Sequence, residues 1–249
     1  MGLAMLGAVS QGILWGVMVL GVFITYKLLD IADLTVDGSF ALGGSVCAVL
    51  VVSGVDPVLA IFAAMLAGMI AGAVTGFLHT VFEIPAILAG ILTQIALWSV
   101  NLRIMGKSNT PLLRVDTLFS SVTDATGLPQ NVASIIVGLI FAVLIIVALY
   151  WFFGTEIGSA CRATGNNEAM VRALGVDTKV TKMIALTLSN GLVGLSGGLI
   201  CESQGYADIG MGTGAIVIGL AAIVIGEVLG RLTPGKLRSF GSRLTAAVV

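Results

Sequence analysis

The sequence predicts an all-α polytopic transmembrane helical bundle with about seven spans. Of its 249 residues, 57% are hydrophobic and only 10% are charged, and the mean hydropathy is +1.10. The apolar residues gather in runs that are mostly long enough to cross a bilayer, while the charges lie between the runs. A soluble domain does not have this composition. The net charge of −1 argues against a nucleic-acid partner.

The first apolar run could be mistaken for a signal peptide, but it lacks a basic start and a small-residue cleavage site. We therefore expect a retained helix, with the N-terminus outside the cell. The fifth run is almost purely aliphatic and is predicted to face lipid. The expected spans are about residues 3–26, 40–54, 58–82, 85–105, 132–153, 183–201 and 215–229.

The second run is short for a full crossing, and the charged stretch 27–37 that precedes it is expected at the membrane interface. One interpretation is a broken or re-entrant helix whose start is buried in protein. Asp37 and Ser39 would then line a polar cavity at depth. The simpler alternative is that Asp37 is an interfacial N-cap.

Small residues repeat along two of the expected spans. Gly68, Gly72 and Gly76 recur every four residues in the third, which predicts a face where another helix can approach closely. The partner helix could belong to the same chain or to a second copy. The sixth span is also dense in small residues, among them Gly194 and Gly198, which predicts close packing there too.

Polar side chains inside the spans are candidates for a substrate pathway. Gln94, Trp98 and Asn101 share one face of the fourth span, and Asn190 lies near the middle of the sixth. Such groups must find partners within the membrane, either on neighbouring helices or along a watery passage. Interhelical hydrogen bonds are the simpler explanation, and a pathway is the more specific one.

The longest polar interval between two apolar runs is 154–182. Asn166 and Asn167 are suitable helix N-caps, and Glu168 would lie in the first turn. The sequence therefore predicts one short surface helix, although a solvated connecting loop is the alternative. The other expected features are an ion pair between Glu168 and Arg172, a small apolar side from Ala169, Ala173 and Leu174, a left-handed Gly175, and capping of the next segment by Asp177 and Thr178.

Basic residues predict the orientation in the membrane. Arg162, Arg172, Lys179 and Lys182 lie within the polar interval, and a second basic run at 231–243 lies two crossings away on the same side of the membrane. Both are therefore expected in the cytoplasm. The acidic, glycine-rich loop 202–214 would then be outside. We expect 106–130 to be a soluble loop that contains one surface helix.

The sequence argues against catalysis. It has one histidine and three separated cysteines, which give no metal-ligand spacing and no disulfide framework. Hydrolase and zinc-protease motifs are missing, and the stretch 230–236 has phosphate-loop spacing but leucine follows it where a hydroxyl would hold magnesium. Glu83, Glu202 and Glu227 lie near span ends, which disfavours an ion-coupled carrier and favours energy supplied by another subunit.

Several of these stretches resemble a known family. Arg162 to Gly165, Glu168-Ala169 and Arg172 to Val176 resemble the cytoplasmic coupling loop of ATP-binding-cassette (ABC) importer permeases in the branched-chain amino-acid and sugar permease superfamily. The chain departs from the related signature of other importers at Met170 and in lacking a proline after Ile184. The stretches 34–44 and 101–106 resemble a subgroup that is linked to tryptophan and tyrosine uptake.

The resemblance implies one permease domain over 1–249 that is not itself an enzyme and binds no cofactor, in the inner or plasma membrane of a bacterium. A separate cytoplasmic ATPase would bind ATP and Mg, a second permease copy would form a homodimer, and an extracytoplasmic solute-binding protein would deliver an amino acid, with an aromatic one favoured by the subgroup resemblance. An eighth span is expected after 244–249. The alternative is an ion-coupled secondary transporter or channel. The coupling residues would be Arg162, Gly165, Asn167, Glu168, Arg172, Gly175 and Asp177, and the pathway residues Asp37, Ser39, Gln94, Trp98, Asn101 and Asn190.

Overall fold

The computed structural model describes residues 2–113, 115–127 and 129–232. Within these residues, six helical segments are long and apolar enough to cross a membrane, and α10 (Ala215–Leu232) is a shorter apolar helix. These findings confirm the predicted all-α, multi-pass membrane fold. Most of the basic run at 231–243 and the apolar end at 244–249 lie outside the described residues, so the expected eighth span does too.

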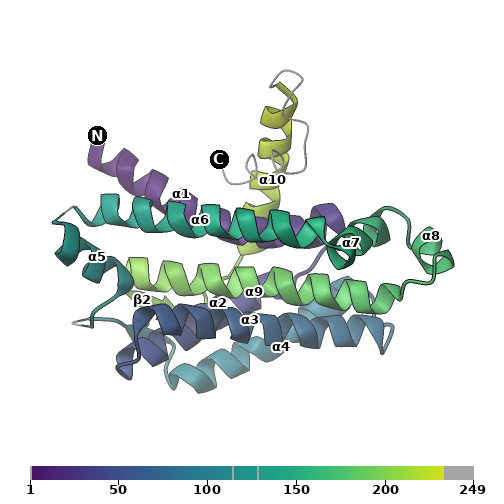
Figure 1. Ribbon diagram of the computed structural model, residues 1–249. Helices are drawn as coiled ribbons and strands as arrows, with labels where there is room; N and C mark the ends of the chain where they lie inside the picture. The colour runs from purple at the N-terminus through teal and green to yellow at the C-terminus, as the bar shows by residue number, and fades with distance from the viewer. Residues whose placement is uncertain (1, 114, 128, 233–249) are drawn as a thin grey trace.

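The bundle is built around α9 (Thr178–Gln204). In the most apolar stretch of α9, 83% of the residues are buried, against 28% in α4 (Ala86–Met105), which therefore lies at the edge. In Figure 1, α1 (Gly2–Phe23) and α6 (Gln130–Gly154) lie on one side of α9, and α2 (Thr35–Val52) and α3 (Pro57–Thr80) lie on the other. α10 projects away from these roughly parallel helices.

The glycines of α3 pack against α9 of the same chain. A Cβ atom on Gly68 or Gly72 would collide with a backbone carbonyl of α9, and one on Gly194 would collide with the backbone of α3. Gly76 lies against Met183, and Gly198 lies against Ala64 and Cys47. The two helices can therefore approach closely only because these residues lack side chains.

The direction of α1 follows from two hydrogen bonds to α9. Ser189 Oγ donates to the Gly21 carbonyl at 2.8 Å, and Ser196 Oγ donates to the Leu14 carbonyl at 2.9 Å. Residue numbers rise along one helix as they fall along the other, so the two helices are antiparallel. The start of α1 therefore lies at the opposite end of the bundle from 154–182, as the expected topology requires.

Helix α2 begins half-way through the bundle. α1 continues as a short π-helix, η1 (Ile24–Leu28), and residues 29–34 then turn back into the bundle. Asp33 bonds to Asn190, which is the thirteenth residue of α9, a helix about 40 Å long at 1.5 Å per residue. This agrees with the buried, broken start considered for the second span. The alternative for Asp37, an interfacial N-cap of its own helix, is wrong because Asp37 lies inside the first turn of α2 at that depth.

The chain returns to the same depth before α10. Gly212 packs against the backbone of Asp37, and the amide nitrogen of Gly214 bonds to the Asp37 side chain. The loop 202–214, which was expected to lie entirely outside, therefore reaches the middle of the bundle. α10 starts there and not at the membrane surface.

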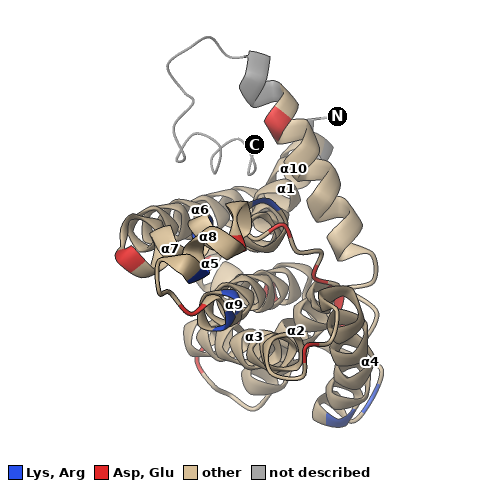
Figure 2. Cartoon of the chain, turned by 90° about the vertical axis from the view of Figure 1, so that its right-hand side faces the viewer, with Lys and Arg blue, Asp and Glu red and all other residues tan. Residues whose placement is uncertain are grey.

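The end of the bundle opposite 154–182 carries a small ribbon that the sequence did not predict. β1 (Asn109–Pro111) pairs in an antiparallel ladder with β2 (Tyr206–Asp208). The expected surface helix is α5 (Leu118–Thr126), and its first amide, at Leu118, donates to Glu202 Oε2 at 2.8 Å. Figure 2 looks along the bundle from the opposite end and shows that most of the helical surface carries no charge.

Candidate functional site

The interval 154–182 folds into two helices where one was expected. α7 (Glu156–Asn166) comes first, and α8 (Glu168–Ala173) follows it directly. The side chain of Asn167 accepts from the Met170 amide at 3.0 Å and so caps α8, as its sequence position predicts. Gly175 has φ +85°, and Asp177 caps α9 by accepting from the Lys179 amide at 2.9 Å. Local hydrogen bonding therefore defines both ends of α8.

Glu168 connects α8 to α9. It forms the expected ion pair with Arg172 at 2.8 Å, and it also accepts from Thr178 Oγ1 at 3.0 Å and from Lys182 Nζ at 2.7 Å. The hydrogen bond from Lys182 is the main reason that the pKa of Glu168 lies below its ordinary value. A motion of α8 would therefore be passed directly to the first turns of α9.

The apolar side of α8 faces outward. Val171 is buried against the bundle, but the Met170 and Leu174 side chains are 49% and 73% exposed. Ala169 and Ala173 are exposed as well. The small apolar side expected from the sequence is therefore an exposed surface at this end of the helical bundle.

α7 packs against the turn that follows α1, at the same end of the bundle as α8. A Cβ atom on Gly165 would collide with the Leu28 carbonyl, so the two backbones touch there. Arg162 is half-buried on α7. Lys179 also reaches Glu83, in the turn between α3 and α4, at 3.3 Å. The interval 154–182 thus contacts two other parts of the bundle, the turn after α1 and the turn between α3 and α4.

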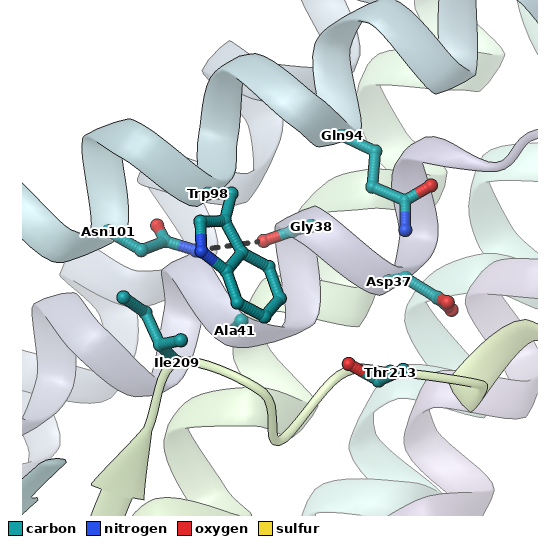
Figure 3. A pocket seen from close by; sticks show the side chains of 8 residues that line it. All are labelled: Asp37, Gly38, Ala41, Gln94, Trp98, Asn101, Ile209 and Thr213. Carbon is teal, nitrogen blue, oxygen red and sulfur yellow. Dashed lines mark hydrogen bonds between the residues drawn. The ribbon is translucent and has the colours of Figure 1, made fainter. Parts of the chain in front are cut away.

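A pocket lies between α2, α4 and the segment that precedes α10, and four of the six expected pathway residues line it. α4 contributes Gln94, Trp98 and Asn101. Figure 3 shows these three side chains together on the face of α4 that is turned toward Asp37 and Thr213. The remaining lining residues are Gly38, Ala41 and Ile209. Nothing in the spacing along the sequence signalled that the 209–213 segment would form one wall.

Asp37 joins the pocket to α10. Its two carboxylate oxygens accept from the backbone amides of Gly214 and Ile216, each at 2.9 Å. These amides belong to the first turn of α10, where a carboxylate is favoured by the positive end of the helix. The side chain therefore caps a helix 177 residues further along the chain.

The other two expected pathway residues, Ser39 and Asn190, do not line the pocket. Ser39 Oγ donates to Asn190 Oδ1 at 2.6 Å, and Asn190 Nδ2 donates to Asp33 Oδ2 at 2.6 Å. Asp33 is only 2% exposed, and its second oxygen accepts from the Thr35 amide at 2.9 Å. The simpler explanation given above for Asn190, a packed hydrogen bond, describes this cluster.

The sequence interpretation missed the burial of two carboxylates. These are Asp33, described above, and Glu202, whose side chain is 1% exposed. Their positions near expected span ends suggested accessible groups. The available signal for Asp33 was its place two residues before Thr35, since an aspartate in that position often accepts a hydrogen bond from the backbone as a helix starts. Over the described residues, no three histidine, cysteine, aspartate or glutamate side chains form a potential metal site.

Comparison with known proteins gives a family match over nearly the whole chain. Residues 4–248 match the family described as branched-chain amino acid transport system, permease component. A tyrosine transport system permease protein of Clostridioides difficile is 39% identical over 191 residues, which cover 77% of this chain and 62% of the relative. The ribose import permease protein RbsC of Escherichia coli K12 is 30% identical over 168 residues, which cover 66% of this chain and 50% of the relative.

A third relative, the uncharacterized protein RP368 of Rickettsia prowazekii, is 34% identical over 189 residues, 76% of this chain and 64% of its own length. The chain thus spans between one half and just under two thirds of these relatives. No solved structure gives a significant match.

Proposed function

The chain belongs to the family of branched-chain amino acid transport permease components, and from this premise we propose that it is the membrane-spanning subunit of an ATP-driven importer. The ATPase is a separate cytoplasmic subunit that binds ATP and Mg, and this chain contributes no catalytic residue and no cofactor. A second permease copy completes the pathway. An extracytoplasmic binding protein delivers the cargo to the end that carries α5 and the β1–β2 ribbon.

The observation that carries this proposal is the construction of α8. The helix presents an exposed apolar side outward, while its only buried side chain is that of Val171. Exposed apolar area at the cytoplasmic end of a membrane protein is stabilised when a partner covers it. The ATPase is that partner in the proposal, and α8 is the element on which it pushes.

Glu168 then transmits the displacement of α8 to the rest of the bundle. Because it bonds to Thr178 and Lys182 at the start of α9, a displacement of α8 moves the central helix. At Gly68 and Gly72 the backbone of α3 lies directly against the backbone of α9. Because this contact is close-packed, the two helices would move together. Closure of the ATPase pair would thus rock the bundle between outward and inward openings, a rigid-body change between two states.

An amino acid is the proposed cargo, with an aromatic one favoured. The permease of a tyrosine transport system is 39% identical to this chain, against 30% for a ribose permease. The pocket supports the same choice, because Trp98 presents an indole ring beside the polar groups of Asp37 and Asn101. Aromatic rings stack favourably on one another.

Uptake by the reconstituted transporter tests the proposal. The complete permease, its ATPase and its binding protein would be placed in vesicles and supplied with labelled tyrosine, tryptophan, leucine and ribose in turn. We expect ATP-dependent accumulation of tyrosine or tryptophan above leucine, and none of ribose. Accumulation of ribose alone would contradict the proposed cargo, and accumulation without ATP would contradict the mechanism.

A second candidate, an ion-coupled carrier, is favoured by one observation. Asp33 is a carboxylate buried at mid-bundle, the kind of group through which proton-driven carriers work. Both of its oxygens are, however, occupied by Thr35 and Asn190. A proton gradient applied to vesicles that contain the permease without its ATPase separates the two candidates, since only the carrier would accumulate solute.

A further inference from the structure

The pocket between α2, α4 and the segment before α10 is closed in this structure. The space that it encloses is about 10 Å³, which is room for about one water molecule. Neither an amino acid nor a sugar fits such a space. A solute can therefore enter only when one of the walls moves, and the three walls differ in how firmly they are held.

The walls formed by α2 and α4 pack closely against each other over successive turns. A Cβ atom on Gly90 in α4 would collide with the amide nitrogen of Leu34. A Cβ atom on Gly38 in α2 would lie only 3.1 Å from the Gln94 Cα atom and 3.2 Å from the Leu97 Cβ atom. Separation of these two walls would therefore disrupt close packing along both helices.

The third wall is the segment 209–216, which leads into α10 and forms its first residues. Its internal hydrogen bonds join residues three positions apart and so maintain the shape of the segment itself. Among the described residues, its hydrogen bonds to other helices are the two that Asp37 accepts from Gly214 and Ile216, each at 2.9 Å. Gly212 also lies against the Asp37 backbone. Asp37 is therefore the main attachment of this wall to α2.

The remainder of α10 is held loosely by the bundle, and Figure 1 shows it leaving the parallel helices. Gly219 packs against Val22 of α1. Further along, Glu227 pairs with Lys27 at 2.9 Å, and such exposed ion pairs contribute little to stability. Four apolar side chains of the helix are between 51% and 66% exposed, those of Val217, Ile218, Val224 and Ile225. The helix would thus offer little resistance to a displacement of its start.

We propose that the pocket opens when the segment 209–216 moves away from α2, and that the Asp37 carboxylate is the latch that keeps it closed. In Figure 3, Ile209 and Thr213 form the wall opposite α4, so withdrawal of the segment enlarges the space in front of the Trp98 ring. Asp37 is here a positioning residue, which holds the wall and does not bind the solute. The inference rests on the proposed function, because it treats the pocket as part of the solute pathway.

The latch has a consequence for binding that a solute ligand does not have. Hydrogen bonds to a carboxylate are strong, so the closed pocket predominates when no solute is present. The apparent affinity for a solute is then reduced by the small fraction of molecules whose pocket is open. A weaker latch should therefore tighten binding, whereas loss of a group that contacts the solute would weaken it.

Hydrogen exchange without any solute tests the latch first. Asp37→Asn keeps the size of the side chain but leaves one acceptor oxygen in place of two. The complete permease with its ATPase would be held in lipid nanodiscs, and exchange of the peptide 209–216 would be followed by mass spectrometry. We expect exchange about tenfold faster than in the wild type, because loss of a charged hydrogen bond favours the open segment. Unchanged exchange would overturn the proposal.

Binding to the same samples gives the second readout. Labelled tyrosine, tryptophan, leucine and ribose would be titrated in turn. Each solute that the wild type binds should bind about tenfold more tightly to Asp37→Asn. Weaker binding would show that the carboxylate contacts the solute, which contradicts its assignment as a latch.

Two further variants separate the latch from a general effect on folding. Gly212→Ala leaves the carboxylate intact, but its Cβ atom would collide with the Asp37 carbonyl and push the segment away from α2, so exchange and affinity should both rise. Asp33→Asn is the matched control, because Asp33 accepts from the Thr35 amide at the start of α2 and does not line the pocket. It should lower the unfolding temperature and leave exchange of 209–216 and affinity unchanged. Equal behaviour of the two asparagine variants would mean that Asp37 is merely structural.

Failure of this inference can be told from failure of the proposed function. If the transporter imports an amino acid while Asp37→Asn and Gly212→Ala leave exchange and affinity unchanged, the latch alone is wrong. If ribose binds in place of the amino acids while exchange and affinity respond as expected, the latch stands and the proposed cargo is wrong.

Discussion

The polar interval 154–182 and the two helix starts at mid-bundle, those of α2 and α10, are both polar regions of an apolar chain, but different contacts stabilise them. The bonds of Glu168 join residues no more than 14 positions apart. At mid-bundle, Ser39 and Asn190 are 151 residues apart, and Asp37 and Ile216 are 179 apart. The Glu168 contacts can form as soon as α8 and the start of α9 form, whereas the contacts at mid-bundle exist only when the whole bundle has assembled.

Removal of the Asp37 carboxylate should have the larger effect on stability. Asp37→Ala leaves the Gly214 and Ile216 amides without an acceptor inside the bundle, where water does not replace it. We expect a loss of about 2 to 4 kcal/mol in the free energy of unfolding, since each unpaired amide costs about 1 to 3 kcal/mol. Denaturant unfolding of the purified permease, followed by tryptophan fluorescence, would measure it.

Asp56→Ala is the matched control for Asp37→Ala. Asp56 also caps a helix, by accepting from the Val58 amide at 2.9 Å, but that hydrogen bond is exposed, so water can replace the side chain. The control should lose about 1 kcal/mol. Equal losses in the two variants would show that depth in the bundle does not matter to the Asp37 cap.

The same contrast explains what the sequence could and could not predict. Asn167, Glu168, Gly175 and Asp177 were placed correctly because caps, an i,i+4 pair and a left-handed glycine depend on neighbours in the chain. Most span limits followed from apolar length, although α2 and α9 each begin five residues earlier than expected, and the glycines of α3 followed from their spacing. Each of these signals lies within one helix.

The partners at mid-bundle carry no such signal. That Asp37 caps α10, that Asp33 meets Asn190, and that β1 pairs with β2 depend on how distant segments pack. The side chains of the fourth span could be assigned to one face, but the Ile209 and Thr213 wall opposite them could not. Sequence patterns thus identified half of the pocket.

A change at Gly175 should have a smaller effect, confined to the interval 154–182. Its φ of +85° disfavours a β-branched residue, while no atom crowds the space that a Cβ would occupy. Gly175→Val should therefore cost about 1 to 2 kcal/mol through backbone strain alone. Asparagine tolerates the left-handed conformation, so Gly175→Asn should cost less. If both variants lose equal stability in the same unfolding assay, the cause is not the backbone conformation.

The pH dependence of the Glu168 contacts should be the smallest effect. Because the pKa of Glu168 is lower in the folded protein, its contribution to stability is complete above the ordinary glutamate pKa and is lost as the pH falls through the lowered value. The difference in unfolding temperature between the wild type and Glu168→Gln should thus be present at neutral pH and shrink in acid. A difference that grows in acid would contradict the assigned contacts.

The ratio of solute uptake to ATP hydrolysis in the complete transporter tests the central claim most directly. Glu168→Lys places a cation beside Lys182 and Arg172 and so detaches α8 from α9, whereas Glu156→Lys makes the same charge change at an exposed position of α7. We predict that Glu168→Lys still hydrolyses ATP but imports about tenfold less solute per ATP, while Glu156→Lys keeps the wild-type ratio. An unchanged ratio in Glu168→Lys would contradict the claim that this contact carries force from the ATPase into the bundle.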